Sequence, residues 1–360
     1  MQVACPRLGA IDFNVSTRKV EYLMKLLTVA IPSYNSADYM GRAIESLLPA
    51  GDQIEILVID DGSKDETLTI AQDYQRRYPD QVKAIHQANK GHGGAVNTGL
   101  AHATGQYFKV VDSDDWVDES ALAAVMATLE RFEAENTQVD VLLTNYVYEQ
   151  GEEGAKRTVR YERNLPINQF FGWDEVKPFS VGEYLMMHSL IYRTQLLRDC
   201  GLILPEHTFY VDNVFVYQPI QHVQRLYYLD VDFYRYLIGR DDQSVNERVM
   251  MGRIDQQLKV NRILIEAVDF SQPLHPSIRQ YLLKHLEIVT SISSALLNRI
   301  GTPEAIAKRQ DLWNFLQERN PEAFKVLRYA FFGRLTTANT RVGRWVSNQV
   351  YKVIRKVGGY

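Results

Sequence analysis

The feature that most limits the possible folds is a regular alternation of short apolar runs with helical patterns. Runs of this length that are rich in Val, Ile and Leu are typical of strands buried on both faces. The apolar runs cover 26–31, 54–59 and 82–86, with a fourth directly before Asp112, and helical patterns cover 37–48, 63–77 and the stretch from 90 onward. Ser63 and Glu66 have the spacing of a capping box for the second of these helices. The alternation predicts an α/β fold with a doubly wound, mainly parallel sheet and helices on both faces.

Composition and charge exclude several classes of protein. The 360 residues are 46% hydrophobic and 23% charged, as in an ordinary globular protein. No apolar run is long enough to span a bilayer, and residues 1–23 lack the apolar centre of a signal peptide, so a cytoplasmic location is expected. Cys5 and Cys200 are too few for a disulfide framework or a zinc knuckle. The formal net charge of −4 argues against nucleic-acid binding.

Three carboxylates follow the fourth strand within four positions, at Asp112, Asp114 and Asp115. Carboxylates this close repel one another unless a cation lies among them, and Mg²⁺ or Mn²⁺ prefers carboxylate oxygens. A solvated acidic turn before the helix that starts near Asp118 is the alternative. A calcium loop is rejected, because the positions that need an oxygen ligand and a Glu hold Trp116 and Ala123. The cluster is therefore interpreted as a metal site.

The other predicted strands end on polar motifs as well. Residues 32–35 follow the first strand, Asp60 and Asp61 close the second, and a Gly-rich stretch at 90–99 follows the third. Ligands of doubly wound sheets bind beyond the carboxyl ends of the strands. The Gly-rich stretch has neither the ending of a P-loop nor the spacing of a dinucleotide fingerprint. Together the motifs suit a base, its ribose and a metal-bridged diphosphate.

The ordered set of motifs resembles family 2 glycosyltransferases with the GT-A fold, most closely over 26–130. The motifs are residues 29–35, 58–65, 89–99 and 112–115. The resemblance implies a nucleotide-sugar donor, most often a UDP-sugar, a Mn²⁺ or Mg²⁺ ion, and inversion at the anomeric carbon. It matches Pro32, Tyr34 and Asp61 to positions around the base, Asp112 to a position near the ribose, and Asp114, with Asp112, to the metal ligands. The further expected donor contacts are Asn35, Lys90, Gly91 and Asn97.

A second chemical stretch surrounds Asp212. It resembles the segment in which this family carries Glu-Asp at a helix start, with the Asp as general base, although Val211 stands where the Glu is usual. The alternative is that Asp212 only caps its helix. Residues 234–236 and 239–244 resemble the family's loop near the donor diphosphate, where Arg240 would neutralise the leaving group or remain an ordinary surface arginine.

His188 lies in a predicted strand over 185–192 and is interpreted as a packed residue rather than a catalyst. The expected domains are a disordered lead at 1–23, a GT-A domain at 24–246 with a donor part (24–118) and an acceptor part (119–246), and a helical C-terminal region at 247–360. Helical spacing in that region covers 254–268, 277–297, 303–316 and 322–332.

Residues 323–360 hold eight Lys or Arg and no Asp or Glu, interleaved with apolar residues. This mixture suits a helix in the interface of an anionic membrane, or else a terminal helix packed on the rest of the region. A peripheral location on the inner face of the cell membrane would follow from the first alternative.

The sequence therefore predicts an inverting, metal-dependent glycosyltransferase that moves a sugar from a nucleotide sugar to a hydroxyl of a glycan or lipid-linked acceptor in cell-surface polysaccharide synthesis. A catalytically silent nucleotide-sugar or glycan-binding protein of the same fold is the alternative. A sugar nucleotidyltransferase is disfavoured, because residues 32–35 are not the Gly-rich basic loop that it needs after its first strand.

Overall fold

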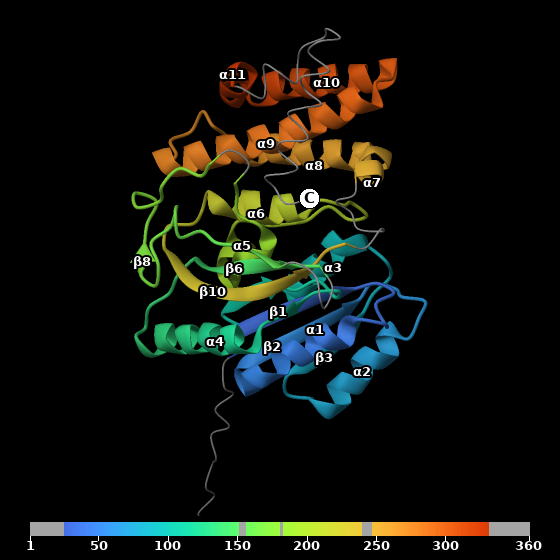
Figure 1. Ribbon diagram of the computed structural model, residues 1–360, viewed down its shortest axis with the longest axis vertical. Coiled ribbons are helices and arrows are strands. Elements are labelled where there is room, and N and C mark those ends of the chain that lie inside the picture. The colour runs from blue at the N-terminus through green and yellow to red at the C-terminus, as the bar shows by residue number, and fades with distance from the viewer. Residues whose placement is uncertain (1–24, 151–155, 181–182, 240–246, 331–360) are drawn as a thin grey trace, which may run out of the picture.

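The computed structural model describes residues 25–150, 156–180, 183–239 and 247–330 (Figure 1). The strands are β1 (Leu27–Ser33), β2 (Ile54–Asp60), β3 (Val82–His86), β4 (Tyr107–Val110), β5 (Trp116–Val117), β6 (Val141–Glu149), β7 (Lys156–Val159), β8 (Phe170–Phe171), β9 (Leu190–Arg193) and β10 (Leu226–Leu237). The helices are α1 (Met40–Leu47), α2 (Thr67–Arg77), α3 (Gly91–His102), α4 (Glu119–Ala134), α5 (Thr194–Asp199), α6 (Asp212–Ile220), α7 (Glu247–Gly252), α8 (Ile254–Ala267), α9 (Pro276–Ile300), α10 (Pro303–Arg319) and α11 (Pro321–Tyr329), with 3₁₀ turns at Leu48–Gln53 and Met187–Ser189.

The strands form one mixed sheet in the order β3-β2-β1-β4-β9-β6-β10-β5. The first four strands are parallel, so their carboxyl ends meet at one edge. β9 is antiparallel to β4 and to β6, while β10 runs parallel to β6. The chain order reverses between β1 and β4, which places a topological switch point beside the ends of both strands. The predicted doubly wound, mainly parallel fold is confirmed.

Burial explains why these runs became central strands. Every residue of β1 and β2 is buried, because helices cover both faces of the sheet. α1 turns Met40, Ala43, Ile44 and Leu47 toward the core, and α2 packs on β3. α3 packs on β1 and β2 on the side of the sheet away from α1 and α2 (Figure 1). The predicted two-sided covering therefore follows from apolar runs that have no polar face.

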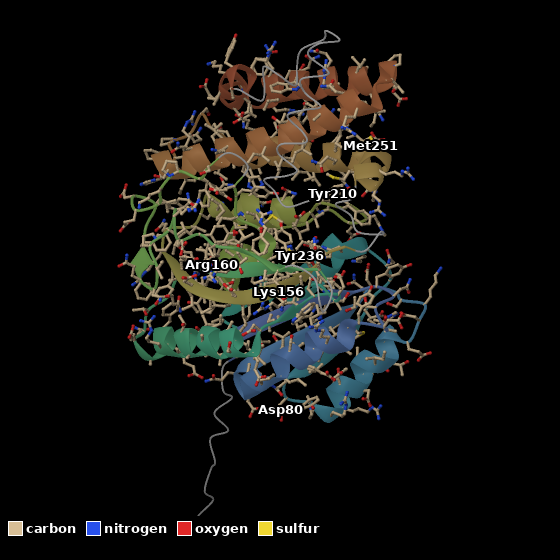
Figure 2. All side chains as sticks on the ribbon, viewed as in Figure 1. Asp80, Lys156, Arg160, Tyr210, Tyr236 and Met251 are labelled. Carbon is tan, nitrogen blue, oxygen red and sulfur yellow. The ribbon has the colours of Figure 1, made fainter. Side chains whose placement is uncertain are left out.

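The C-terminal helices pack against the α/β part of the described chain. α8 and α9 pack against α6, and α10 and α11 form a further layer (Figure 1). In the view with all side chains, Tyr210, two positions before α6, is drawn between Tyr236 of β10 and Met251 of α7 (Figure 2). None of the helices in the described part of the chain is both long and apolar enough to cross a membrane. Residues 1–23 and 331–360 lie outside the described residues, so the lead and most of the basic tail stay predictions.

Three local predictions were wrong. α2 begins without the predicted capping box, because the Ser63 hydroxyl accepts the Asn35 N–H at 3.0 Å and Asp65 instead accepts the Thr67 N–H at 3.1 Å. The predicted strand at 185–192 forms only from Leu190, after a 3₁₀ turn at Met187–Ser189. Residues 234–236 lie in β10 and not in a loop.

Candidate active site

The carboxyl ends of β1, β2 and β4 gather most of the predicted site residues. Pro32 is buried within β1, whereas the Tyr34 side chain just beyond it is 46% exposed. Asn35 has a positive φ of 50° and uses its side-chain oxygen to accept the Lys64 N–H at 2.9 Å. Asn35 therefore joins the ends of β1 and β2, while Tyr34 presents an open aromatic ring beside them.

Asp61 holds the start of α3. Its carboxylate accepts the Gln87 amide at 2.7 Å and the Lys90 N–H at 2.8 Å on Oδ1, and the Gly91 N–H at 2.8 Å on Oδ2. The N-cap side chain of α3 makes no capping hydrogen bond. Asp61, directly after β2, therefore supplies the anion at this helix start. Asp61 is buried and anchors the Gly-rich segment; its contact with a base stays a prediction.

The glycines of this segment permit close packing against residues 204–207. Gly91 has a φ of +74°, and a Cβ there would meet the His207 backbone at 3.0 Å. A Cβ on Gly93 would lie 2.6 Å from the Pro205 carbonyl oxygen. The Asn97 amide donates to the Leu204 carbonyl at 2.8 Å and accepts the Leu204 N–H at 2.9 Å.

Lys90 reaches the same segment through Glu206, with 3.4 Å between the ammonium and the carboxylate. The Gly-rich stretch therefore fixes the segment that leads to Asp212. The predicted donor contacts of Lys90, Gly91 and Asn97 stay predictions.

His92 lies in the first turn of α3 and pairs with the acid cluster. Its Nε2 is 2.8 Å from Asp112 Oδ1. Burial alone would lower the pKa of His92, but the charge and hydrogen bond of Asp112, with further charge from Asp212 and Asp114, raise that pKa. Burial alone would raise the pKa of Asp112, but the charge and the hydrogen bond of His92, with smaller contributions from other groups, lower that pKa below its usual value. An imidazolium–carboxylate pair is thus favoured here, within electrostatic reach of Asp212.

Asp115 is held by β10. Its Oδ2 accepts the Tyr234 hydroxyl at 2.6 Å and its Oδ1 accepts the Leu237 N–H at 2.8 Å. Burial and the charges of Asp114 and Asp112 raise the pKa of Asp115 well above its usual range, against these two hydrogen bonds. The three carboxylates therefore repel one another when all are ionised, and a bound cation would relieve this repulsion.

Lys109 lies on β4 beneath this cluster. Its ammonium donates to the carbonyls of Met187 at 3.0 Å and His188 at 2.6 Å, and burial lowers its pKa to about 7. The His188 ring stacks on Tyr234 with 4.6 Å between ring centroids. Burial lowers the pKa of His188 to about 4, so its imidazole is neutral, and its Nδ1 is buried without a hydrogen-bond partner. A neutral imidazole with an available lone pair is the form that binds metals.

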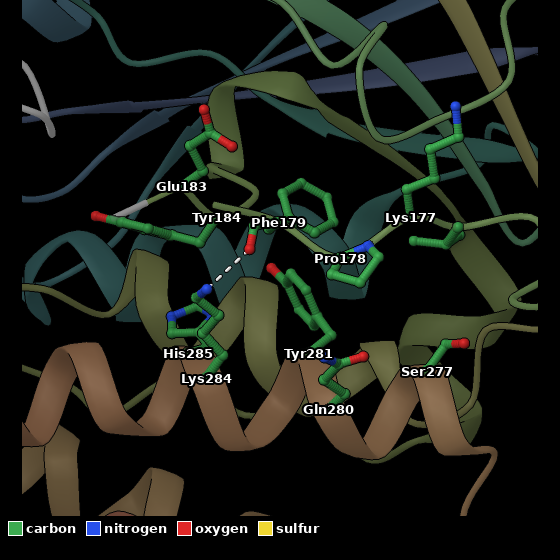
Figure 3. Close-up of a pocket in the computed structure, with 11 residues that line it drawn as sticks. Lys177, Pro178, Phe179, Glu183, Tyr184, Ser277, Gln280, Tyr281, Lys284 and His285 are labelled. Atoms are coloured by element: carbon green, nitrogen blue, oxygen red, sulfur yellow. Dashed lines mark hydrogen bonds between the residues drawn. The ribbon is translucent and has the colours of Figure 1, made fainter. Parts of the chain in front are cut away.

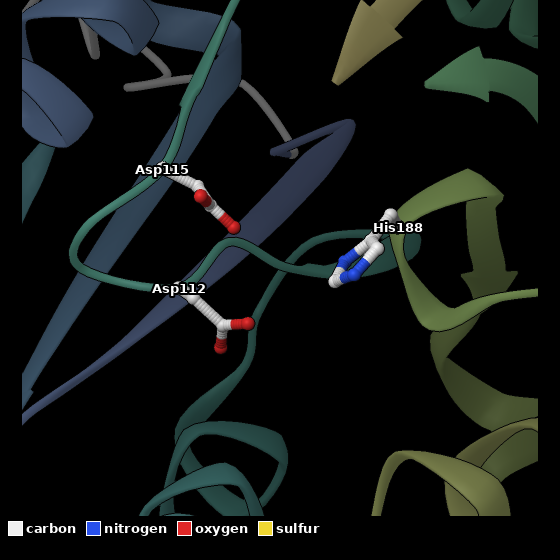
Figure 4. A group of neighbouring side chains, drawn as sticks. All are labelled: Asp112, Asp115 and His188. Atoms are coloured by element: carbon white, nitrogen blue, oxygen red, sulfur yellow. The ribbon is translucent and has the colours of Figure 1, made fainter. Parts of the chain in front are cut away.

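Among the described residues, one group of acids and histidines has ligand atoms close enough to share an ion. Oxygens of Asp112 and Asp115 and a nitrogen of His188 all lie within 4.8 Å of one another (Figure 4). Asp112 was a predicted ligand. Asp114 is not in this group, and its predicted role as a ligand stays a prediction.

Asp212 is the first residue of α6, as its predicted place at a helix start requires. Burial raises its pKa, opposed by hydrogen bonds from Asn213 and by the His92 charge. The Asn213 amide donates to Asp212 Oδ1 at 3.2 Å. The N-cap of α6 is Val211, which has no polar side chain, and the role of Asp212 as a base stays a prediction. Arg240 lies outside the described residues.

Sequence reasoning missed His92 and Lys109, and it interpreted His188 only as a packed residue. His92 stood inside a Gly-rich motif that drew attention to its glycines, and His188 followed two methionines in an apolar run. Only the lysine carried a readable signal, since a charged residue in the middle of an apolar strand needs a partner.

Comparisons with known proteins concern the family of part of the chain and the fold of most of it. Residues 28–194 match the Glycosyl transferase family 2 profile. Over 240 residues the chain is 27% identical to an uncharacterized glycosyltransferase, EpsJ, of Bacillus subtilis (strain 168), covering 66% of this chain and 67% of that protein. It is 26% identical over 229 residues to the minor teichoic acid biosynthesis protein GgaA of the same strain, covering 62% of this chain and 49% of GgaA. The chain therefore spans about half of GgaA.

The fold extends beyond the matched region. The crystal structure of S. aureus TarS 1–349 in complex with UDP superposes with a TM-score of 0.64 at 20% identity, covering 92% of this chain and 90% of that one. This coverage includes the C-terminal helices as well as the sheet. On its matched residues, its sheet and the acids at the strand ends, the chain contains a family 2 glycosyltransferase domain over residues 28–194.

Proposed function

We propose that the chain transfers a sugar, with inversion, from a nucleotide sugar to a hydroxyl group of a cell-surface glycan acceptor. One observation carries the proposal. His92 is paired with Asp112 and is also within electrostatic reach of Asp212, although 100 positions separate Asp112 from Asp212. The predicted donor-side acid and the candidate base thus both act electrostatically on one imidazole beyond the strand ends, which supports a shared site.

The donor would bind over the ends of β1 and β2. Tyr34 offers an exposed ring on which a nucleobase can stack, and Asp61 keeps the neighbouring backbone in place through its three accepted hydrogen bonds. The TarS complexes with UDP and UDP-GlcNAc make uridine nucleotides the first donors to test.

The residues present fit a divalent ion. Two carboxylates and a neutral imidazole whose Nδ1 has no hydrogen-bond partner lie together, and the clustered acids need a positive charge. Asp112, with Asp115 and His188 or with Asp114, would hold the ion. A bound ion of this kind would offset the charge that grows on the leaving diphosphate. One imidazole among the ligands favours Mn²⁺ over Mg²⁺.

Asp212 would act as the general base. An acceptor oxygen would form its bond to the anomeric carbon while the bond from that carbon to the diphosphate oxygen breaks, and Asp212 would take the hydroxyl proton. Burial raises the pKa of Asp212, which makes its carboxylate a better proton acceptor than an exposed one. Arg240 is proposed to stabilise the leaving group, as the sequence resemblance implies.

The teichoic acid role in the name of GgaA supports a cell-surface polymer as acceptor. The proposed membrane contact rests on the basic tail, whose residues from 331 lie outside the described part. Co-sedimentation with anionic vesicles tests it, by comparing the full chain with a variant in which Lys352, Arg355 and Lys356 are Gln. Equal sedimentation of the two proteins contradicts membrane binding through these three residues, and no sedimentation of either protein at low salt contradicts membrane binding.

A donor screen tests the proposed function. Thermal melting with Mn²⁺ present should show stabilisation by one class of nucleoside diphosphate sugar, because a ligand that binds only the folded state raises the stability of that state by mass action. The parent nucleotide diphosphate should stabilise the same protein. Melting temperatures that no nucleotide sugar shifts at millimolar concentration would contradict a donor site.

A further inference from the structure

His285 connects the C-terminal helices to the candidate base. It lies on α9, buried to 1% exposure, beside a small pocket of about 60 Å³ whose lining includes Tyr184 and Tyr281 (Figure 3). Its Nε2 is 3.2 Å from the side-chain oxygen of Asn213, which adjoins Asp212. Residue 285 is 72 positions from Asn213, so this contact belongs to the packing of α9 on α6 and not to local structure.

The orientation of the Asn213 amide follows from its surroundings. Its nitrogen faces two acceptors, the Tyr210 carbonyl and Asp212 Oδ1, each at 3.2 Å. Rotating the amide by 180° would set its oxygen against both acceptors, which is repulsive. The amide oxygen must therefore face His285, and only a protonated Nε2 can donate to it.

The state of His285 agrees with this requirement. Burial lowers the pKa of His285 to about 3, so the ring is neutral and carries one proton. That proton lies on Nε2 if the ring donates to Asn213, which leaves Nδ1 as a bare acceptor. Nδ1 is in fact buried without a hydrogen-bond partner. Ring contacts with Tyr184, Tyr217 and Tyr281, with centroids 5.1, 5.4 and 6.1 Å away, fix the imidazole in this position.

We propose that His285 is a positioning residue for catalysis: through Asn213 it orients the Asp212 carboxylate toward the acceptor hydroxyl. The inference rests on the proposed role of Asp212 as base. Asn213 holds Oδ1 of Asp212, which leaves Oδ2 to receive the proton. The C-terminal helices are then part of the catalytic apparatus, since α9 supplies the group that locks the amide. General bases act efficiently only when their oxygen is within hydrogen-bond reach of the proton that they accept.

The test compares variants of His285 in the full chain, with saturating donor and varied acceptor. His285→Phe keeps a flat ring but removes the donor, so kcat should fall by a factor of about 10 to 100 while the affinity for the nucleotide diphosphate stays unchanged. His285→Gln restores an N–H donor and should recover most of kcat. Gln280→Ala, an exposed position on the same helix, is the matched control and should retain the original kcat.

Asn213→Ala removes the other partner of the same hydrogen bond and keeps the packing of His285. It therefore tests the proposal even if the His285→Phe protein does not fold. His285→Phe should add little to Asn213→Ala, because two residues that act in one chain are not additive. Unchanged kcat in Asn213→Ala, or equal loss in His285→Phe and His285→Gln, overturns the proposal. Asp212→Asn separates the two claims: if it keeps full transfer, the proposed base is wrong, whereas if it loses transfer and His285→Phe does not, only the positioning role fails.

Discussion

Replacing Asp61 by Asn should destabilise the start of α3. The amide oxygen can still accept from Gln87 and Lys90, but the new NH₂ group would face the Gly91 N–H, and both groups are donors. One hydrogen bond to a charged group is worth about 2 kcal/mol. Loss of the anion at a helix N-terminus costs about 1 kcal/mol more. The free energy of unfolding should therefore fall by about 3 kcal/mol. If only the start of α3 opens, the free energy of that local opening should fall by the same amount.

Two measurements check this expectation. Urea denaturation gives the change in unfolding free energy, and hydrogen exchange of the Lys90 and Gly91 amides reports local opening. Glu206→Gln is the matched control, because it breaks an exposed ion pair of the same segment, and such pairs contribute about 0 to 1 kcal/mol. If Asp61→Asn lowers the affinity for UDP while stability and exchange remain those of the original protein, Asp61 contacts the base and does not anchor the segment.

Three further predictions follow from the site and its support. Gly93→Ala should cost about 1 to 3 kcal/mol of stability and reduce kcat, because its Cβ would press on the Pro205 carbonyl; an unchanged melting temperature and kcat contradict the close contact. His188→Gln should weaken Mn²⁺ binding, measured by calorimetry, by a factor of about 10 to 100; unchanged affinity there, with loss in Asp114→Asn, assigns the ion to Asp112 and Asp114. The neutral His285 must gain a proton on unfolding below pH 6.5, so its depressed pKa of about 3 should remove about 3 kcal/mol of stability between pH 6.5 and 4. Urea unfolding of His285→Gln should lack that part of the pH dependence, and an identical dependence in both proteins would show that His285 is not buried as a neutral ring.

The fold was predictable where a local pattern reflects burial. β1 and β2 are covered on both faces, so their sequences are mainly apolar, and the acids at and beyond the end of β2 lie at the edge where such a sheet binds ligands. β10 was missed because Asp230 and Asp232 interrupt its pattern. These acids are paired with Arg160 through contacts at 2.7 and 2.8 Å, a partner 70 positions away that no local pattern reveals.

The candidate site was predictable only in part, for a similar reason. Asp112 and Asp212 could be found because each stands at the start of a recognisable motif. The roles of the surrounding residues depend on packing between distant segments: Asp61 caps a helix that begins 30 positions later, and His285 reaches Asn213 across the interface of α9 and α6. Propensity and spacing describe neighbours in sequence, whereas these contacts are set by how the layers stack.

Sugar transfer that depends on Asp212 is the central claim, and a direct comparison of two proteins tests it. The donor identified by thermal melting is incubated with Mn²⁺ and a hydroxyl-bearing cell-surface glycan acceptor, and both the released nucleotide diphosphate and the glycosylated product are quantified. The unmodified chain should form both in equal amounts. Asp212→Asn should bind the nucleotide with the same affinity and form product more slowly by a factor of about 10² to 10⁴, because it lacks the carboxylate that takes the acceptor proton. Product formation at the original rate by Asp212→Asn, with its nucleotide affinity unchanged, would contradict the account.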